Sequence, residues 1–520
     1  MTASELRETH ISWVVLTGEF AYKIKKPVTF PFLDYGTLER RRECCGEEVR
    51  LNRRFAPGVY LGVLEIASAG QPFEYAVEMR RYDEHATLAA QLPTLQPADL
   101  IAVGRAVAGF HASAPRAEGD RALTSVVEET LVTLDGAGAR VQDLARFYRS
   151  ALSALAPELE RRRRAGLVRD GHGDLRAEHI LLGEPIQAVD GLEFDASLRI
   201  ADVAYDFAFL VMDVSRRDDD LARALVRGYR AAGGDPGSDR LLALLCSIRA
   251  LVRAKVDLLR AAQLTGAAAD ERAARSRELL ALAERFAWRA RLPRVVCVIG
   301  HAASGKSTLA EALAVASGRT VLSSDRTRKL RAGVAPYAYA GAQAYGDAES
   351  RAVYAELGRR ALRCTDGAIV DATFRRRSDA DAFVEFVPDA GWIVCEAPPE
   401  VLIERARMRA LRDDSVSDAG PEIVQAELAR HGRIRPPATP IARLDTTRSV
   451  PELLVQLGAA LDTAATVHCA PEAENRGRAN PAPRTPGKPA AALRVAPDAR
   501  TRGKRDDGAK GGDEHDVDLP

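Results

Sequence analysis

The residues best suited to chemistry lie in "GHAASGKS", residues 300–307, which matches the pattern G-x-x-x-x-G-K-[S/T]. Glycine lets the backbone N–H groups curve around phosphate oxygens, and the following helix adds its favourable dipole. Lys306 would neutralise the β- and γ-phosphate oxygens, and Ser307 would reach Mg²⁺. The pattern predicts a site for ATP and Mg²⁺; the alternative is a Gly-rich turn without a ligand. The predicted nucleotide-binding residues are Gly300, Ser304, Gly305, Lys306, Ser307 and Thr308.

Polar residues farther along the chain are expected near this phosphate site. "SSDRTRK" places Asp325 and Arg328 just after an apolar segment, where a substrate would face the γ-phosphate. "IVDATF" places Asp371 at the carboxyl end of a predicted strand, which lies close to the phosphate site in a parallel sheet. An ordinary helix N-cap is the alternative interpretation of Asp325.

Three arginines, Arg405, Arg409 and Arg412, recur at helical spacing before a polar turn. This spacing predicts a lid whose arginines close over the phosphoryl group in transfer. A solvated helix face would show the same pattern in an Arg-rich chain.

Residues 292–462 resemble the small P-loop kinases that phosphorylate hydroxyl groups of metabolites, sugars or polynucleotide 5′ ends, and the zeta-toxin group. The resemblance implies Asp325 as the base or orienting group for the acceptor hydroxyl. It also implies Arg328 as a substrate contact and Asp371 as part of the Mg²⁺ shell. The predicted catalytic residues here are Lys306, Asp325, Arg328, Arg405 and Arg409, and the predicted metal residues are Ser307 and Asp371.

A second set of candidate residues lies in the first half of the chain. "FAYKIKK" offers Lys23, or Lys25 on the same strand face, to hold nucleotide phosphates. The next predicted helix offers Glu48, or its neighbour Glu47, to pair with that lysine.

"GHGDLRAEHI", residues 171–180, then places Asp174 where a kinase-like catalytic loop has its general base. "AVDGLEFD" places Asp190 after an apolar segment as the expected Mg²⁺ ligand. His179 stands where such a loop carries a metal-binding Asn, and one ring nitrogen of a neutral His could bind a metal. Imidazole suits softer ions than Mg²⁺, so the site is either reworked or weakened.

The first half resembles the aminoglycoside phosphotransferase and choline kinase branch of the kinase-like fold. The whole chain is similar, over about residues 9–462, to the bacterial bifunctional aminoglycoside phosphotransferase/ATP-binding protein family. "THISWVVLTGEFAYKIKKPVTF", "GHGDLRAEHI" and "SGKSTLA" carry this resemblance. The sequence has neither a DFG triplet nor a G-x-G-x-x-G phosphate loop. A pseudokinase domain kept for folding or regulation is therefore the alternative, and the family name does not establish aminoglycosides as substrates.

The elements that must position these residues follow from hydrophobic periodicity. Alternating segments in residues 10–80 predict a small β lobe, and apolar residues at helical spacing in 96–291 predict a larger helical lobe. After Pro293, short apolar strands alternate with helices, which predicts a doubly wound parallel sheet in an α/β fold. We expect three regions: a kinase-like domain at 1–291, a P-loop kinase-like domain at 292–462, and a disordered tail at 463–520.

The composition narrows the function classes. A formal net charge of +1 gives no electrostatic footprint for nucleic acid or membranes. The first residues carry charge and no apolar run, and no segment is apolar over the length of a membrane span. Seven cysteines without CxxC spacing are typical of a reducing cytoplasm, where we expect the protein to act.

Together these features predict an ATP- and Mg²⁺-dependent kinase acting on an unidentified small-molecule acceptor through its second domain. Activity of the first domain stays open. The alternative from another class is a nucleotide-dependent regulatory or scaffold protein. A nucleic-acid kinase is disfavoured, because residues 292–462 contain no basic patch interleaved with aromatic residues.

Ending the chain at Thr463 should leave folding and both sites intact, because the Pro-, Gly- and charge-rich tail cannot bury a core. The measurement is the thermal midpoint and the ATP affinity of the shortened chain beside the full chain. A fall of several degrees in the midpoint would contradict the predicted role of the tail.

Overall fold

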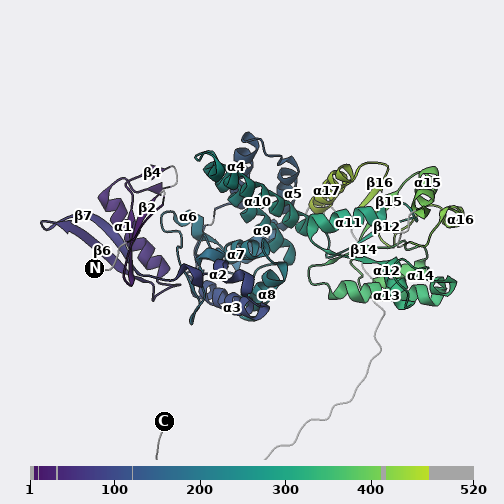
Figure 1. The fold of residues 1–520 in the computed structure, drawn as a ribbon, viewed down its shortest axis with the longest axis horizontal. Helices are drawn as coiled ribbons and strands as arrows, with labels where there is room; N and C mark the ends of the chain where they lie inside the picture. The colour runs from purple at the N-terminus through teal and green to yellow at the C-terminus, as the bar shows by residue number, and fades with distance from the viewer. Residues whose placement is uncertain (1–4, 10, 31–32, 120, 412–416, 468–520) are drawn as a thin grey trace, which may run out of the picture. The chain divides into compact units, whose positions relative to one another are not determined.

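The computed structural model describes residues 5–9, 11–30, 33–119, 121–411 and 417–467 (Figure 1). These residues belong to one compact unit, and the predicted domain boundary at residues 291/292 stays a prediction. Within the described ranges no helix combines the length and the apolar character needed to cross a membrane.

The chain begins with a five-stranded antiparallel sheet in the order β1-β2-β3-β7-β6. Alternation along β3 places Ala21, Lys23 and Lys25 on one face of this sheet. Helix α1 packs on the sheet and starts at the N-cap Thr37, whose side chain accepts a hydrogen bond from the Arg40 N–H. The elements are β1 (Glu5–Glu8), β2 (Ser12–Thr17), β3 (Phe20–Lys25), β4 (Thr29–Phe30), β5 (Leu33–Asp34), α1 (Leu38–Asn52), β6 (Tyr60–Ser68) and β7 (Gln71–Arg80).

A helical region follows, as the periodicity predicted. Its large core joins side chains of α3, α5, α7, α8, α9 and α10. The helices are α2 (Leu88–Gln91), α3 (Pro97–Ser113), α4 (Leu123–Gly136), α5 (Gln142–Arg164), α6 (Ala196–Arg199), α7 (Val203–Ser215), α8 (Asp219–Ala231), α9 (Asp239–Ala261) and α10 (Ala267–Arg291).

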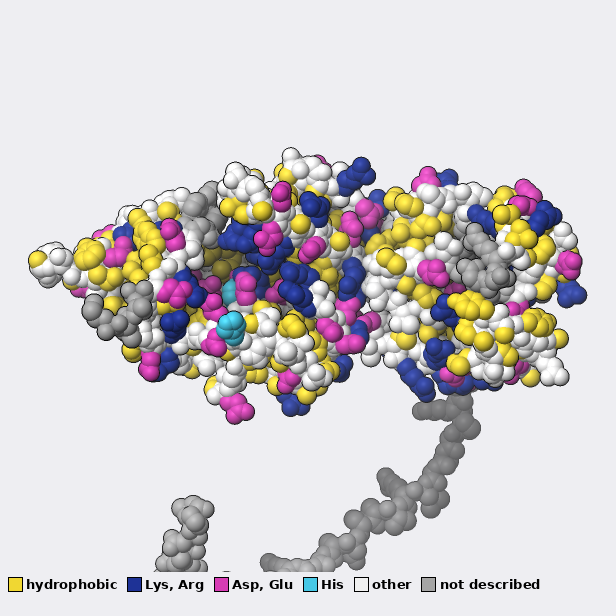
Figure 2. All heavy atoms as spheres, in the orientation of Figure 1, with side chains coloured by type: hydrophobic (Ala, Val, Ile, Leu, Met, Phe, Trp, Pro, Cys, Tyr) yellow, Lys and Arg dark blue, Asp and Glu magenta, His cyan; other side chains and the backbone are white. Residues whose placement is uncertain are grey.

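Short strands interrupt these helices and carry the catalytic-loop candidate. Strand β8 pairs with β11, and β9 pairs with β10, both antiparallel. They are β8 (Val168–Asp170), β9 (Ile180–Leu181), β10 (Gln187–Ala188) and β11 (Ile200–Asp202), and the short 3₁₀ helices of the chain are Glu84–Ala86, Leu92–Thr94, Ala177–His179 and Ala342–Tyr345. In the space-filling view, Lys and Arg side chains gather between α6 and the α9/α10 pair (Figure 2).

The second sheet has five parallel strands in the order β13-β14-β12-β15-β16, which confirms the predicted doubly wound fold. Its strands are β12 (Val295–Gly300), β13 (Thr320–Ser323), β14 (Ala368–Asp371), β15 (Gly391–Glu396) and β16 (Ala442–Asp445). Its helices are α11 (Lys306–Ser317), α12 (Ser324–Arg331), α13 (Asp347–Arg363), α14 (Arg377–Val384), α15 (Pro399–Ala410), α16 (Pro421–His431) and α17 (Val450–Val467).

Both faces of this sheet are buried, as a parallel sheet requires. Alternate residues of β12 enter two different cores: Cys297 packs with α13 and α14, whereas Val296 and Val298 pack with α11 and α17. Figure 1 shows these two pairs of helices on opposite faces of the sheet. The carboxyl ends of β12, β13 and β14 therefore meet at one edge, where the phosphate motif begins.

The predicted tail start at residue 463 falls inside a helix. Helix α17 continues to Val467, and its residues Leu453, Leu457 and Leu461 are buried against the second sheet. The rest of the predicted tail, residues 468–520, lies outside the described residues, as does Arg412.

Candidate functional site

The phosphate motif forms the turn between strand β12 and helix α11. A Cβ on Gly300 would lie 2.3 Å from the Ser304 Oγ and 2.6 Å from the Cys395 carbonyl oxygen, so only glycine fits there. Gly305 has a φ of +79°, in the left-handed region that favours glycine. Lys306 is 7% exposed and makes no hydrogen bond or ion pair with any described residue. A buried ammonium without a counter-ion is costly, so the turn is suited to an anion that would pair with it.

The residues predicted to hold Mg²⁺ are in direct contact. The Ser307 hydroxyl donates a hydrogen bond to Asp371 Oδ2 at 2.7 Å. Asp371 Oδ1 is buried and has no partner among the described residues. Burial raises the pKa of the Asp371 carboxyl above its usual value, while Lys306 opposes this change. A hydroxyl and a carboxylate are the hard oxygen donors that Mg²⁺ prefers.

No cluster of three or more His, Cys, Asp or Glu side chains suited to a metal ion occurs among the described residues. The pair Ser307 and Asp371 still fits Mg²⁺, because this ion is usually held by one or two protein oxygens, with waters and substrate phosphates supplying the rest.

A cavity of about 800 Å³ joins the phosphate turn to other predicted residues. Asp325, Arg405 and Arg409 line it together with Lys306 and Ser307. The alternative interpretation of Asp325 as a helix cap is wrong, because Ser323 is the N-cap of α12. Asp325 makes no hydrogen bond or ion pair within the described part of the chain.

The two arginines predicted to form a lid, Arg405 and Arg409, are fixed by backbone carbonyl oxygens. Arg405 donates to the Thr446 carbonyl oxygen at 2.7 Å, and Arg409 donates to the Ala419 carbonyl oxygen at 2.6 Å. Burial lowers the pKa of Arg409, and Asp325 opposes this change. The alternative, in which Arg405 and Arg409 belong to a solvated helix face, does not fit their positions in the cavity lining.

Arg328 is not among the residues that line the cavity. Its guanidinium is buried, donates to the Ala344 carbonyl oxygen, and lies 4.6 Å from the centre of the Tyr345 ring. Because the Arg328 guanidinium already binds the segment that contains Ala344 and Tyr345, its position does not support the predicted role of Arg328 as a substrate contact.

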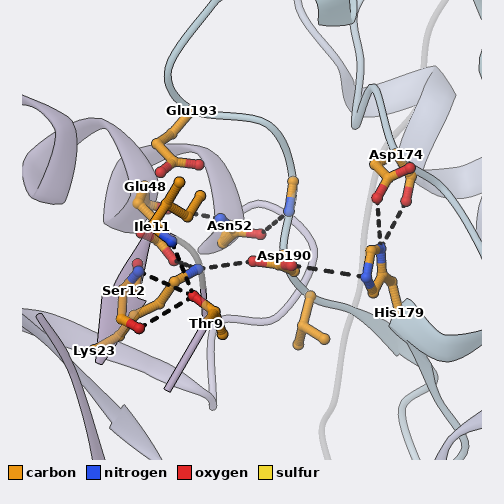
Figure 3. Close-up of polar contacts among 12 residues, drawn as sticks. Thr9, Ile11, Ser12, Lys23, Glu48, Asn52, Asp174, His179, Asp190 and Glu193 are labelled. Atoms are coloured by element: carbon orange, nitrogen blue, oxygen red, sulfur yellow. Dashed lines mark hydrogen bonds and ion pairs between the residues drawn. The ribbon is translucent and has the colours of Figure 1, made fainter. Parts of the chain in front are cut away.

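In the first half, Lys23 joins two carboxylates (Figure 3). Its Nζ lies 2.8 Å from Glu48 Oε1 and 2.9 Å from Asp190 Oδ1. Burial alone would lower the pKa of Lys23, but Asp190 and Glu48 raise it well above its usual value. The same lysine holds the pKa of Asp190 far below its usual range. Asp190 has a φ of 63°, so its backbone is strained at the place where its side chain meets Lys23.

The geometry separates the paired candidates that the sequence left open. Lys25 is fully buried and reaches the other oxygen of Glu48, Oε2, at 2.8 Å, together with Glu193. Glu47 pairs instead with Arg50 and Arg199. Only Lys23 therefore faces Asp190, and Glu48 is the carboxylate that joins both lysines.

His179 lies between the predicted base and the predicted metal residue (Figure 3). Its Nδ1 is 2.7 Å from the Asp174 carbonyl oxygen, so Nδ1 carries the proton and donates it. Its Nε2 is 3.7 Å from Asp190 Oδ2 and 3.3 Å from Arg176 Nη2. The unprotonated Nε2, if released from Arg176, and the Asp190 carboxylate could together hold a metal, but one nitrogen makes the pair a poorer fit for Mg²⁺ than Ser307 with Asp371.

Asp174 is held by a neighbour that the motif did not single out. Arg176 donates to both Asp174 oxygens, at 2.9 to 3.0 Å. Burial would raise the pKa of Asp174, but Arg176 and His179 lower it below its usual value. A carboxylate with a lowered pKa is a weaker general base.

Asp206 is a second positioning residue that sequence reasoning missed. Its carboxylate accepts hydrogen bonds from the N–H groups of His172 at 2.8 Å and Gly173 at 3.0 Å, which fixes the loop before Asp174. It lies in α7, 32 residues beyond Asp174, where no sequence pattern marks it.

Comparisons with known proteins match the two regions of the chain that contain these candidate sites. The family model described as "Phosphotransferase enzyme family" matches residues 47–244, and the model described as "AAA domain" matches residues 295–434. The chain therefore combines a kinase-like phosphotransferase domain with a P-loop kinase-like domain.

The chain is 33% identical over 467 residues to uncharacterized proteins from Mycobacterium bovis and Mycobacterium tuberculosis. This match covers 82% of this chain and 90% of theirs. The chain belongs to the bacterial bifunctional aminoglycoside phosphotransferase/ATP-binding protein family, which confirms the predicted resemblance.

Solved structures match the two parts separately. A choline/ethanolamine kinase family protein from Mesorhizobium loti is 17% identical, with a TM-score of 0.36, over 55% of this chain and 92% of its own. A gluconokinase from Sinorhizobium meliloti is 21% identical, with a TM-score of 0.26, over 34% of this chain and 94% of its own. At these scores neither likeness carries an argument about the acceptor.

The contacts of Glu48 predict a large loss of stability on its substitution. Glu48→Gln leaves buried Lys25 and Lys23 without their shared carboxylate, and should lower the free energy of unfolding by about 3–5 kcal/mol. Denaturant unfolding of the full chain measures this change.

The matched control is Glu47→Gln, one residue earlier on the same helix. Its partner Arg199 keeps Asp170, so the loss should be about 1 kcal/mol or less. Equal losses for the two variants would contradict the central role of Glu48.

Proposed function

We propose that the P-loop domain transfers the γ-phosphate of ATP to a hydroxyl group of a small acceptor. The observation that carries this proposal is the cavity of about 800 Å³ that Asp325 lines together with residues of the phosphate turn. The Asp325 carboxylate does not cap its helix and has no described partner, so it is available to accept a proton. A nucleotide-binding turn that served only as a switch would not need such a group.

In the proposed reaction, Asp325 accepts the proton of the acceptor hydroxyl while the hydroxyl oxygen attacks the γ-phosphorus. Lys306 counters the phosphate charge, and Arg405 and Arg409 face the phosphoryl group in transfer. Mg²⁺, when bound, would neutralise the β- and γ-phosphate oxygens. Ser307 and Asp371 are the residues that would hold it.

A small-molecule acceptor is proposed rather than nucleic acid, on the near-zero net charge of the chain. The free cysteines among the described residues are in keeping with the proposed action in a reducing cytoplasm.

A second phosphotransfer site is proposed in the kinase-like domain. Its support is the ion pair between Lys23 and Glu48, which protein kinases need in place for activity. Lys23 would hold the nucleotide phosphates, Asp190 the Mg²⁺, and Asp174 the acceptor proton. The rival is a nucleotide-dependent regulatory or scaffold protein with an inactive kinase-like domain, and the clamp of Arg176 on Asp174 favours it.

Replacing the proposed base should slow transfer without weakening ATP binding. We expect Asp325→Asn to keep ATP affinity and to lower the rate by about 10²-fold or more, because proton removal loses its acceptor. Lys306→Ala should instead lose nearly all ATP affinity at this site, because the phosphates lose their counter-ion. The measurements are ATP titration and γ-phosphate transfer to a metabolite pool, followed by mass spectrometry.

The control is Asp381→Asn, an exposed acid of α14 outside the cavity, which should change neither quantity. An unchanged transfer rate in Asp325→Asn would remove Asp325 from the reaction. Normal transfer by a folded chain lacking both Lys306 and Lys23 would overturn the assignment of both sites.

The kinase-like site can be tested in the full chain that carries Lys306→Ala, because this change should remove ATP binding at the P-loop site. If the site works, ATP affinity depends on Mg²⁺, and Asp190→Asn abolishes that dependence. His179→Asn should preserve or raise it, because an amide oxygen is a harder ligand than imidazole. Absence of ATP binding in the folded Lys306→Ala chain would favour the regulatory alternative.

A further inference from the structure

A large apolar cavity has Asp174, but not Lys23, among its lining residues. Its volume is about 840 Å³, which suits a ligand of drug size. Helices α4, α5, α7 and α9 and the segment after Asp190 line it mostly with apolar side chains, among them Val126, Leu159, Phe194, Leu198, Ile200 and Val256.

A smaller cavity of about 480 Å³ contains Lys23, Asp190 and His179. The two cavities share Asp174, Leu192, Phe194 and Arg253 in their linings. Asp174 therefore lies where a nucleotide phosphate on one side would meet an acceptor hydroxyl on the other. This position makes the apolar cavity the candidate for the acceptor.

Every acidic side chain that lines the apolar cavity is already paired. Glu129 binds Lys255 and Arg121, and Asp202 binds Arg162. The remaining two are Glu160, paired with Arg163 and Arg164, and Asp174, paired with Arg176. No carboxylate lining the cavity is left over to bind a cationic ligand.

Unlike these acids, two arginines that line the apolar cavity lack a complete set of polar partners among the described residues. Arg249 and Arg253 lie four residues apart on α9, so they share one face of the helix. Arg249 is 6% exposed, and its buried Nη2 has no hydrogen-bond partner among the described residues. Its guanidinium is fixed by the Tyr205 carbonyl oxygen at 3.0 Å and by the Tyr205 ring at 3.6 Å.

Arg253 makes no hydrogen bond or ion pair within the described ranges. Burial and nearby Arg176 lower its pKa, while Asp174 and Asp257 oppose this change without forming an ion pair with it. An anion between Arg249 and Arg253 would supply the missing partner in the cavity that Asp174 also lines. Figure 2 shows Lys and Arg side chains gathered over this part of the kinase-like domain.

We propose that the acceptor of the kinase-like site is an amphiphilic anion: an apolar body that fills the cavity, an acidic group bound by Arg249 and Arg253, and a hydroxyl group near Asp174. The inference rests on the proposed activity of this site. The hydroxyl oxygen forms the new bond to the γ-phosphorus of ATP, the bond to the β-phosphate oxygen breaks, ADP leaves, and Asp174 takes the hydroxyl proton. A polycationic aminoglycoside is the opposite of the ligand that this lining fits.

Three probes of equal chain length test the charge preference: ω-hydroxydecanoate, decanediol and ω-aminodecanol. Calorimetric titration into the full Lys306→Ala chain should show the anion binding about tenfold tighter than the diol, and the amine binding weakest. Kanamycin should not compete. Tighter binding of the amine or of kanamycin than of the anion would overturn the proposal, and so would absence of binding by all probes.

Variants of Arg253 test whether this arginine causes the preference for the anionic probe. Arg253→Gln should remove the tenfold advantage of the anion, and Arg253→Glu should reverse it. The matched control, Arg105→Gln, replaces an exposed arginine of α3 outside both cavities and should leave it unchanged. An anion preference that survives Arg253→Glu would overturn the assignment.

Failure of the proposed activity can be told apart from failure of this inference. Probe binding is measured without ATP, and Mg²⁺-dependent ATP binding at Lys23 is measured without a probe. An anion preference without ATP binding would refute the kinase activity and keep the ligand class. ATP binding together with a preference for the amine would keep the kinase activity and refute the ligand class.

Discussion

The buried carboxylate of Glu48 is the interaction on which the kinase-like domain depends. It faces Lys23 and Lys25, two like charges on one face of β3 that would repel each other without it. Through Lys23 it reaches Asp190, and through Lys25 it reaches Glu193, both in the segment that follows the catalytic loop. One side chain thus joins the small sheet to the helical lobe and fixes where Lys23 can meet a nucleotide.

The two candidate sites differ in how their polar groups are satisfied. In the kinase-like site, Lys23, Asp174 and Asp190 all have charged partners. In the P-loop site, Lys306 and Asp371 Oδ1 are buried without described partners, and Asp325 lines the same cavity. Unsatisfied buried groups cost stability unless a ligand completes them. This contrast is why the P-loop site carries the main functional proposal and why the kinase-like site must rearrange around Asp174 to act.

Membership of a family named after aminoglycoside phosphotransferases does not by itself choose an acceptor, because a fold supports many substrates. The linings of the cavities are more informative. Paired acids, together with Arg249 and Arg253 of α9, give the apolar cavity a positive character, whereas an aminosugar would require free carboxylates. The fold explains where the phosphoryl group would be transferred, and the lining side chains explain to what class of molecule.

The sequence by itself determined the two domain types, the parallel sheet and the residues of the phosphate turn, because each depends on local spacing: a fixed run of Gly, Lys and Ser, and apolar residues at the periods of strands and helices. It also placed Asp371 correctly, since strand ends of a parallel sheet meet at one edge.

Other features were decided only by tertiary structure. Lys23 and Lys25 share a strand face, so only the position of Asp190 separates them. Helix α7, which carries Asp206, was not predicted because nearly all its residues are buried and it lacks the polar face that gives a helical period. The contact of Arg328 with the Ala344 carbonyl oxygen, the ion pair between Arg176 and Asp174, and the incomplete pairing of Arg249 and Arg253 likewise depend on tertiary contacts or on side-chain direction. Sequence spacing records neither.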